Sequence, residues 1–230
     1  MERARQFPQR HTLGLMGGTF DPIHIAHLIM AEEVRTTLGL SQMVFVPAGE
    51  PPHKMLRPVT PVQHRLAMVE LAIITNPHFT ISRVEVDRSG PSYLVDTLHL
   101  LHEQWGQDVD ISFVIGWDSL EDFPGWYKPA EILAQLTQLI AVRRPGYVDD
   151  SAYNEKLEAR LPGLKEKLRI VPVPQLDISS TDIRNRVAEQ RPIKYQVPDA
   201  VEDYIREHGL YQTEIEVAVQ ATRHSTHTER

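Results

Sequence analysis

The stretch that decides the fold is LGLMGGTFDPIHIAHL, which runs from Leu13 to Leu28. An apolar strand leads into two glycines, Gly17 and Gly18, and a helix with two histidines follows. Glycines let backbone N–H groups approach a phosphate closely, and a helix N-terminus adds partial positive charge and free N–H donors. The spacing of His24 and His27 predicts that both lie on one helix face near its start. The stretch is therefore typical of a site that holds a polyphosphate.

Strand and helix patterns alternate along the rest of the chain. Strands are predicted at Leu13–Met16, Met43–Pro47, Thr80–Val86, Ile111–Ile115, Leu139–Val142 and Arg169–Val173. Helices are predicted at Ala26–Leu38, Val62–Ile74, Tyr93–Trp105, Ala130–Leu136 and Asp199–His208, with Pro61 at a first helical position and Gly209 at a C-cap. Because several strands are continuously apolar, this pattern predicts an α/β fold with a doubly wound, Rossmann-like parallel sheet. Such sheets bind ligands at the carboxyl ends of their strands.

The domain organisation follows from the same patterns. We expect a single domain over residues 12–212, preceded by a flexible extension over 1–11 and followed by a disordered tail over 213–230. Within the domain, Pro145–Gly163 is charged and is interpreted as an insertion or a mobile helix. The sequence shows no internal repeat.

Composition narrows the function classes. The chain has 230 residues, 41% of them hydrophobic, which is enough for one large α/β domain or two small ones. A formal net charge of −7 argues against nucleic acid or an anionic membrane as the partner, and no apolar run approaches the length of a membrane span. The absence of cysteine excludes disulfides and thiolate chemistry. Because Met1–His11 is not typical of a signal peptide, we expect a cytoplasmic protein. Whether it forms a homo-oligomer stays open.

A second motif, ISSTDIR, covers Ile178–Arg184. Ser179 followed by Asp182 is typical of a helix start, and a plain helix cap is one interpretation of this motif. The other interpretation includes Arg184, which comes one turn later. Hydroxyls, free N–H groups and a guanidinium would then converge on one point, an arrangement that suits a di- or triphosphate.

Four loop segments carry further candidate residues. Lys54 ends a proline-stiffened loop after the second predicted strand and could place a cation over phosphates. Tyr93 begins a predicted helix whose N-terminus can receive a carboxylate. Asp118 follows a buried strand, and Trp126 lies on a Pro-Gly loop where it can offer a flat face to an aromatic ring. Taken singly, the lysine is more typical of an exposed surface, and each aromatic residue is more typical of a core than of a site.

The two motifs together resemble the nucleotidylyltransferase superfamily. Its first signature is Gly-x-Phe-Asp-Pro-x-His-x-Gly-His, from which this chain departs only at Ala26, and its second is Ile-Ser-Ser-Thr-x-Ile-Arg, which matches at every fixed position. In their order along Leu13–Tyr211, the segments resemble the bacterial nicotinate-mononucleotide adenylyltransferase family. That resemblance implies that His24 and His27 are catalytic and hold the reacting phosphates.

The resemblance also divides the remaining residues between two substrates. It places Gly17, Gly18, Thr19, Phe20, Lys54, Ser179, Ser180, Thr181 and Arg184 on ATP and its phosphates, and Tyr93, Leu94, Asp118 and Trp126 on the mononucleotide. Leu94 stands where the family commonly has threonine. If backbone N–H groups recognise the pyridine carboxylate, Leu94 still serves, whereas a requirement for a hydroxyl would change the specificity.

The implied reaction is adenylyl transfer from ATP to nicotinate mononucleotide, which gives deamido-NAD and pyrophosphate. Mg²⁺ would arrive with ATP, so we expect no metal ligands of the protein's own, and the histidines would act at least partly as imidazolium. The alternatives are a preference for the amide mononucleotide or for both, another acceptor such as phosphopantetheine, and a nucleotide-binding relative without catalysis. A Rossmann dehydrogenase is disfavoured because no Gly-x-Gly-x-x-Gly follows the first strand.

Overall fold

The centre of the fold is a parallel sheet of six strands in the order β3-β2-β1-β4-β5-β6. A computed structural model describes residues 12–51, 59–106, 108–143, 151–174 and 176–212. The strands are β1 (Thr12–Gly18), β2 (Gln42–Pro47), β3 (Phe79–Ile81), β4 (Asp110–Gly116), β5 (Gln138–Arg143) and β6 (Leu168–Pro172). This order reverses direction between β1 and β4, and doubly wound sheets bind ligands at such a switch point.

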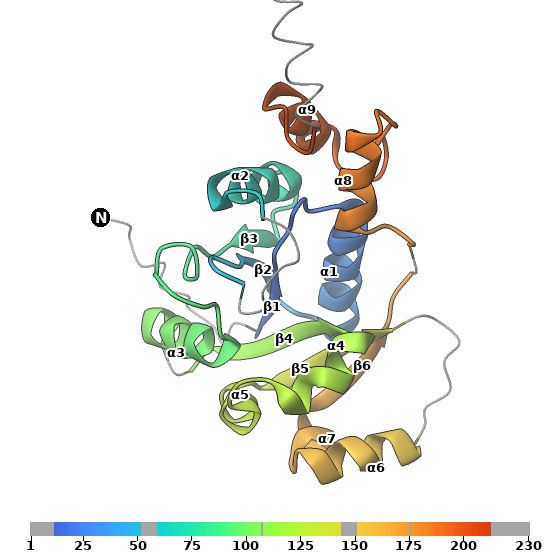
Figure 1. The fold of residues 1–230 in the computed structure, drawn as a ribbon. Helices are drawn as coiled ribbons and strands as arrows, with labels where there is room; N and C mark the ends of the chain where they lie inside the picture. Colours follow the sequence, from blue (N-terminus) through green and yellow to red (C-terminus); the bar gives the residue numbers. More distant parts are fainter. Residues whose placement is uncertain (1–11, 52–58, 107, 144–150, 175, 213–230) are drawn as a thin grey trace, which may run out of the picture.

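Helices cover both faces of this sheet (Figure 1). They are α1 (Ile25–Leu38), α2 (Val62–Ile73), α3 (Leu94–Trp105), α4 (Trp117–Asp122), α5 (Pro129–Gln135), α6 (Ser151–Arg160), α7 (Leu164–Lys167), α8 (Ser180–Ala188) and α9 (Asp199–Glu207), with a 3₁₀ turn at Phe123–Gly125. Figure 1 shows α1, α2, α8 and α9 on one side of the sheet and α3, α5, α6 and α7 on the other. The predicted doubly wound α/β fold is confirmed.

Successive side chains of the central strands contribute alternately to two separate hydrophobic cores. Leu15 packs in the cluster beneath α3 and α5, while its neighbour Met16 packs in the cluster beneath α1 and α2. In β4, Phe113 and Val114 divide between the two clusters in the same way. Successive strand side chains point to opposite faces, so a sheet covered on both faces needs apolar residues at nearly every position. This requirement is why the central strands were recognisable from sequence.

The third predicted strand is wrong beyond Ile81. Ser82 Oγ accepts the Val84 N–H at 3.4 Å, and the Asp87 N–H donates to the Arg83 carbonyl at 2.9 Å. The Ser82 N–H still donates to the Phe45 carbonyl of β2 at 2.9 Å, but the local bonds then use the N–H groups of Val84 and Asp87, which cannot continue the ladder with β2. The segment predicted as strand Thr80–Val86 therefore contributes only a short edge strand and then leads toward α3.

Smaller differences concern helix ends and short helices. Pro61 is the N-cap of α2 and lies one position before the first helical turn, and α9 has its C-cap at His208, with Gly209 following at φ +58°. The short helix α4 was not predicted, while α6 lies inside the segment interpreted as an insertion or mobile helix. The expected extension over 1–11 and tail over 213–230 lie outside the described residues. Within the described ranges, no helix has the length and apolarity needed to cross a bilayer.

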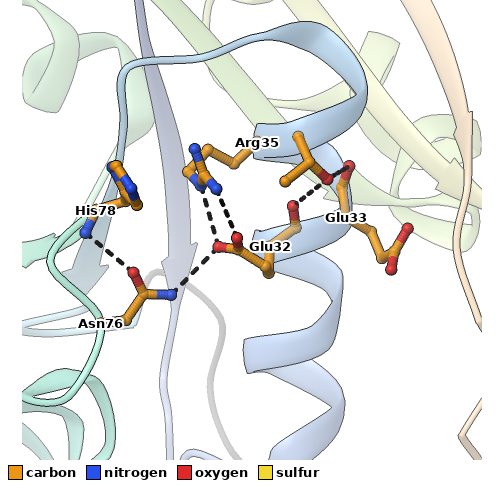
Figure 2. Close-up of polar contacts among 6 residues, drawn as sticks. Glu32, Glu33, Arg35, Asn76 and His78 are labelled. Atoms are coloured by element: carbon orange, nitrogen blue, oxygen red, sulfur yellow. Dashed lines mark hydrogen bonds and ion pairs between the residues drawn. The ribbon is translucent and has the colours of Figure 1, made fainter.

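The far end of α1 is tied to the α2–β3 connection by a polar network (Figure 2). Glu32 accepts from Nε and a terminal nitrogen of Arg35 at 3.0 and 2.6 Å, and from Asn76 Nδ2 at 3.2 Å. Asn76 Oδ1 in turn accepts the His78 N–H at 2.9 Å. Because β3 begins just after His78, this network fixes the amino end of the edge strand, on the side of the sheet away from the strands' carboxyl ends.

Candidate active site

The turn after β1 places two histidines side by side at the start of α1. His24 is the N-cap with extended backbone (φ −145°, ψ 170°), and His27 lies in the first turn. Their rings stack with centroids 3.7 Å apart and planes inclined by 25°. The two side chains do share one location, as predicted, although His24 precedes the helix and does not lie on its face.

The tautomer of His27 follows from its hydrogen bond. The His24 N–H donates to His27 Nδ1 at 3.2 Å, so Nδ1 carries no proton and Nε2 of the neutral ring is a donor. His24 is buried at 6% exposure, and its Nδ1 has no hydrogen-bond partner among the described residues. A buried polar atom without a partner is costly, so a ligand that supplied one would bind more favourably.

Both histidines are neutral at neutral pH in the ligand-free protein. Burial lowers the pKa of His24 from 6.5 to about 4. Burial, and secondarily the charge of His24, lowers the pKa of His27 to about 3. Spacing in the sequence does not reveal this desolvation. The expectation that the two side chains are partly imidazolium while they hold phosphate stays a prediction.

Some backbone N–H groups at the start of α1 already have hydrogen-bond acceptors within the protein. The Ile25 N–H donates to the Gln196 carbonyl at 2.9 Å, and the His27 N–H donates to the His24 carbonyl at 3.0 Å. These two bonds use donors that the sequence interpretation assigned to a phosphate. A ligand at this turn would depend more on the histidine Nε2 atoms, on the glycine-rich turn and on groups contributed by other elements.

Helix α8 supplies such groups, because its start docks directly on the turn. Ser179 Oγ accepts the Asp182 N–H at 3.0 Å, which confirms the predicted cap. Ser180 Oγ donates to the Pro22 carbonyl at 2.8 Å, across 158 residues of sequence. Arg184 donates to the Asp21 carbonyl at 2.6 Å and to Thr181 Oγ1 at 2.9 Å. The two sequence motifs are thus in direct contact.

The remaining predicted residues follow the carboxyl ends of neighbouring strands. Asp118 is exposed in the first turn of α4, directly after β4, which pairs with β1. Trp126 is half-buried and its ring packs against those of Phe113 and Phe123, with centroids 6.3 and 5.3 Å away. Lys54 lies outside the described residues.

Tyr93 and Leu94 form the start of α3, where Tyr93 is the N-cap and Leu94 the first helical residue. The Tyr93 ring lies 4.6 Å from that of Tyr127, an exposed residue that sequence reasoning did not single out. In the described part of the chain, no group of three or more His, Cys, Asp or Glu side chains could hold a metal ion.

Comparison with known proteins places this chain in a family. A cytidylyltransferase-like family model matches residues 15–186. A protein from Thermomicrobium roseum named "probable nicotinate-nucleotide adenylyltransferase" is 51% identical over 87% of this chain and 92% of its own length. Proteins with the same name from a Roseiflexus strain and from Dehalococcoides mccartyi are 48% and 43% identical, each over 86% of this chain.

The chain belongs to the nicotinate-nucleotide adenylyltransferase family. Solved structures agree with the family's fold. A Plasmodium falciparum nicotinic acid mononucleotide adenylyltransferase in complex with NaAD superimposes with a TM-score of 0.65 over 87% of this chain and 97% of its own, at 22% identity. The likeness at this identity concerns the arrangement of sheet and helices.

One part of the site was missed by sequence reasoning, namely the polar residues beneath the family's signature turn. Asp21, which is 2% exposed, accepts the Tyr211 hydroxyl at 2.8 Å and the Thr60 N–H at 3.4 Å. Burial, with the nearby Asp21 carboxylate, raises the pKa of Tyr211, so the phenol keeps its proton and donates it. Arg65 also reaches the turn from α2. A charged residue inside a helical pattern is normally assigned to solvent, so the sequence offered no signal for Arg65.

Proposed function

We propose that this chain transfers the adenylyl group of Mg·ATP to nicotinate mononucleotide, giving deamido-NAD and pyrophosphate. An oxygen of the mononucleotide 5′-phosphate attacks the α-phosphorus of ATP in line. The bond from that phosphorus to the bridging oxygen of the β-phosphate breaks, and pyrophosphate leaves with the electron pair. A phosphate is already ionised at neutral pH, so the site needs to position the reactants and neutralise charge more than it needs a base.

The observation that carries this proposal is the docking of α8 on the histidine turn. Adenylyl transfer requires groups on the α-phosphate and on the departing pyrophosphate at once. His24 and His27 stack at one end of the site, and Ser180 and Arg184 are bonded to the carbonyls of Pro22 and Asp21 in the same turn. This arrangement supports a single ATP polyphosphate held between the two motifs.

The hydrogen bonds within the protein determine which donors each group can still provide to a phosphate. Neutral His27 presents Nε2–H, so we assign it as a donor to a phosphate oxygen that gains charge in the transition state. Ser179 and Thr181 accept through their hydroxyl oxygens and keep their own protons to donate. Ser180 already donates to Pro22, so its contribution would come through its backbone N–H at the helix start. Glycines 17 and 18, with Thr19 and Phe20, would line the same phosphates.

We assign the acceptor subsite to the start of α3 and the loop that contains Trp126. Leu94 and Val95 are the first residues of α3, and first-turn N–H groups have no partner inside a helix. A carboxylate on the pyridine ring can accept from such groups with both oxygens, whereas an amide would place an NH₂ donor against them. Trp126 would contact the ring, and Asp118 the ribose side. This assignment makes the hydroxyl missing at Leu94 unnecessary.

Mg²⁺ enters as part of the ATP substrate, held mainly by phosphates and water. The cytoplasmic location expected from the sequence stays a prediction. A non-catalytic relative is disfavoured because both histidines and Arg184 are retained.

The deciding experiment compares two acceptors with the same protein. Purified protein is incubated with MgATP and either nicotinate or nicotinamide mononucleotide, and dinucleotide and pyrophosphate are quantified by chromatography. We expect equimolar products and a kcat/KM for the acid at least about 10²-fold above that for the amide, since mismatched buried donors are strongly discriminated against. Equal values would refute the selectivity while leaving adenylyl transfer standing, and no dinucleotide from either acceptor would refute the proposed function.

A further inference from the structure

We propose that Arg65 is a positioning residue that sets the two substrate subsites at the correct distance from each other. The inference rests on the proposed function and adds a residue to it. Arg65 lies in the first turn of α2, on the other side of the signature turn from α8, and is only 2% exposed. No ligand needs to touch it for this role.

The guanidinium of Arg65 donates hydrogen bonds to backbone carbonyls of three separate segments. One terminal nitrogen donates to the Thr19 carbonyl in the signature turn at 2.7 Å. The other donates to the Ala48 carbonyl at 2.7 Å and to the Gly49 carbonyl at 3.3 Å, just after β2. Nε donates to the Thr60 carbonyl at 2.9 Å, just before α2. The planar, rigid geometry of these donors fixes the three segments relative to one another.

The bond to Thr19 determines which way the next peptide group faces. In a trans peptide, the C=O and the following N–H point in opposite directions. With its carbonyl held by Arg65, the Thr19–Phe20 peptide directs the Phe20 N–H away from α2. Phe20 itself has φ +49°, a conformation that is uncommon for a residue with a side chain and that its surroundings must maintain. Its buried ring meets the His27 ring edge-on at 5.2 Å, so the orientation of this peptide is linked to the catalytic histidine.

Through its bonds to Ala48 and Gly49, Arg65 also fixes the position of the acceptor subsite. The Gly49 N–H donates to Ser92 Oγ at 3.1 Å, and the Ser92 N–H donates to the Glu50 carbonyl at 2.8 Å. Gly49 also packs so closely on the Glu85 carbonyl that a Cβ atom would overlap it. Ser92 immediately precedes Tyr93 and Leu94, the residues assigned to the mononucleotide. Arg65 therefore bonds on one side to the ATP turn and on the other to the segment that carries the acceptor-binding residues.

A guanidinium is needed for this role, and a positive charge alone would not replace it. The charge of Arg65 lies near the buried Asp21 carboxylate, which favours the charged form against the burial that lowers its pKa. Lysine would retain the charge, but its donors radiate from a single nitrogen and could not span Thr19, Ala48 and Thr60 together. Arg65→Lys is thus the substitution that removes the geometry with the least change in charge and volume.

The expected kinetic signature is a fall in kcat with little change in either KM. Each substrate would still find its own contacts, whereas the distance between attacking oxygen and α-phosphorus would change. A displacement of about 1 Å can lower a rate about 10²-fold. We expect Arg65→Lys and Arg65→Gln to lower kcat about 10- to 100-fold and to change the KM values for ATP and mononucleotide less than about 3-fold.

The test measures kcat and both KM values together with thermal unfolding of each variant. Arg35→Lys is the matched control, because Arg35 bonds to Glu32 at the far end of α1 (Figure 2) and should keep wild-type kinetics. Unchanged kcat in folded Arg65→Lys, or a loss confined to one KM, would overturn the proposal. If neither Arg65 variant folds, Ser92→Ala decides: we expect kcat to fall about 3- to 10-fold, and unchanged kcat would overturn it. Failure of the proposed function is distinguishable, since the wild-type protein itself would then form no dinucleotide.

Discussion

The two nitrogens of His27 have different tasks, and a pair of substitutions can separate them. Nδ1 accepts the His24 N–H at 3.2 Å, while Nε2–H is the donor assigned to phosphate. In His27→Asn, the amide oxygen can occupy the place of Nδ1, but nothing reaches the place of Nε2. In His27→Ala, both functions are lost. The two variants should therefore agree in rate and differ in stability.

The magnitudes follow from the contacts. Loss of a donor to developing charge costs about 10²- to 10³-fold in kcat, and we expect this loss in both variants. Both also lose the ring stacked on His24 and the edge contact with Phe20. Only His27→Ala leaves the His24 N–H without its acceptor, which costs about 1 kcal/mol in free energy of unfolding. We thus expect His27→Asn to be more stable than His27→Ala by about 1 kcal/mol.

Steady-state release of pyrophosphate gives the rates, and urea unfolding followed by circular dichroism gives the stabilities. His99→Asn is the control, since His99 is an exposed residue of α3 that pairs with Glu103 and should leave both quantities unchanged. Near-normal kcat in folded His27→Asn would refute the assignment of Nε2–H to phosphate. Equal stabilities of the two variants would refute the tautomer inferred from the His24 bond.

Three further predictions concern pH and the two subsites. Because the folded pKa values of His24 and His27, about 4 and about 3, lie below the unfolded value of 6.5, the unfolded chain binds more protons. The stability present above pH 6.5 should therefore fall as the pH drops toward 4, by at most about 1.4 kcal/mol per pH unit per histidine and less for half-buried His27. Urea unfolding at pH 7 and pH 5 should show a shallower pH dependence of stability in His24→Asn than in wild type. Arg184→Ala should raise the KM for ATP about 10-fold or more, and the KM for the mononucleotide much less, in steady-state assays. Equal increases in the two KM values would mean that the bond from Arg184 to the Asp21 carbonyl is the whole role of this residue. Trp126→Ala should weaken both mononucleotides by a similar factor in calorimetric titrations, and selective loss of the acid would indicate that Trp126 recognises the carboxylate.

The apolar patterns of the strands made the fold predictable from sequence, whereas local polar contacts could not be predicted from these patterns. Residues such as Leu15 and Met16 serve opposite faces of one covered sheet, so the central strands stand out as apolar runs. The edge strand is different, because Ser82 and Asp87 form a turn from side-chain and backbone bonds that no apolar periodicity reports. Helix α8 was located by its cap, Ser179, whose bond to the Asp182 N–H is a local event that sequence specifies directly.

In the candidate site, too, some features could be predicted from the sequence and others could not. That the histidine turn and Ser179–Arg184 meet could be inferred from their family motifs, and they do meet through Ser180 and Arg184. The protonation of the histidines could not be inferred, because it depends on burial in the folded protein. Arg65 and Tyr211 could not be found either, since each acts on the turn from a distant segment through one or a few hydrogen bonds.

The bonds between the two motifs change how mutations in this site should be interpreted. Arg184 and Ser180 hold the carbonyls of Asp21 and Pro22 before any substrate binds, and Arg65 holds that of Thr19 from the other side. The turn is therefore fixed in advance from both sides, which reduces the reorganisation needed when phosphate binds. A loss of activity on replacing Arg184 would combine a lost phosphate contact with a displaced turn. To separate these contributions, the changes in KM for ATP and for the mononucleotide must be compared with those in Arg65→Lys. In that variant we expect the turn to be displaced while every phosphate contact is retained.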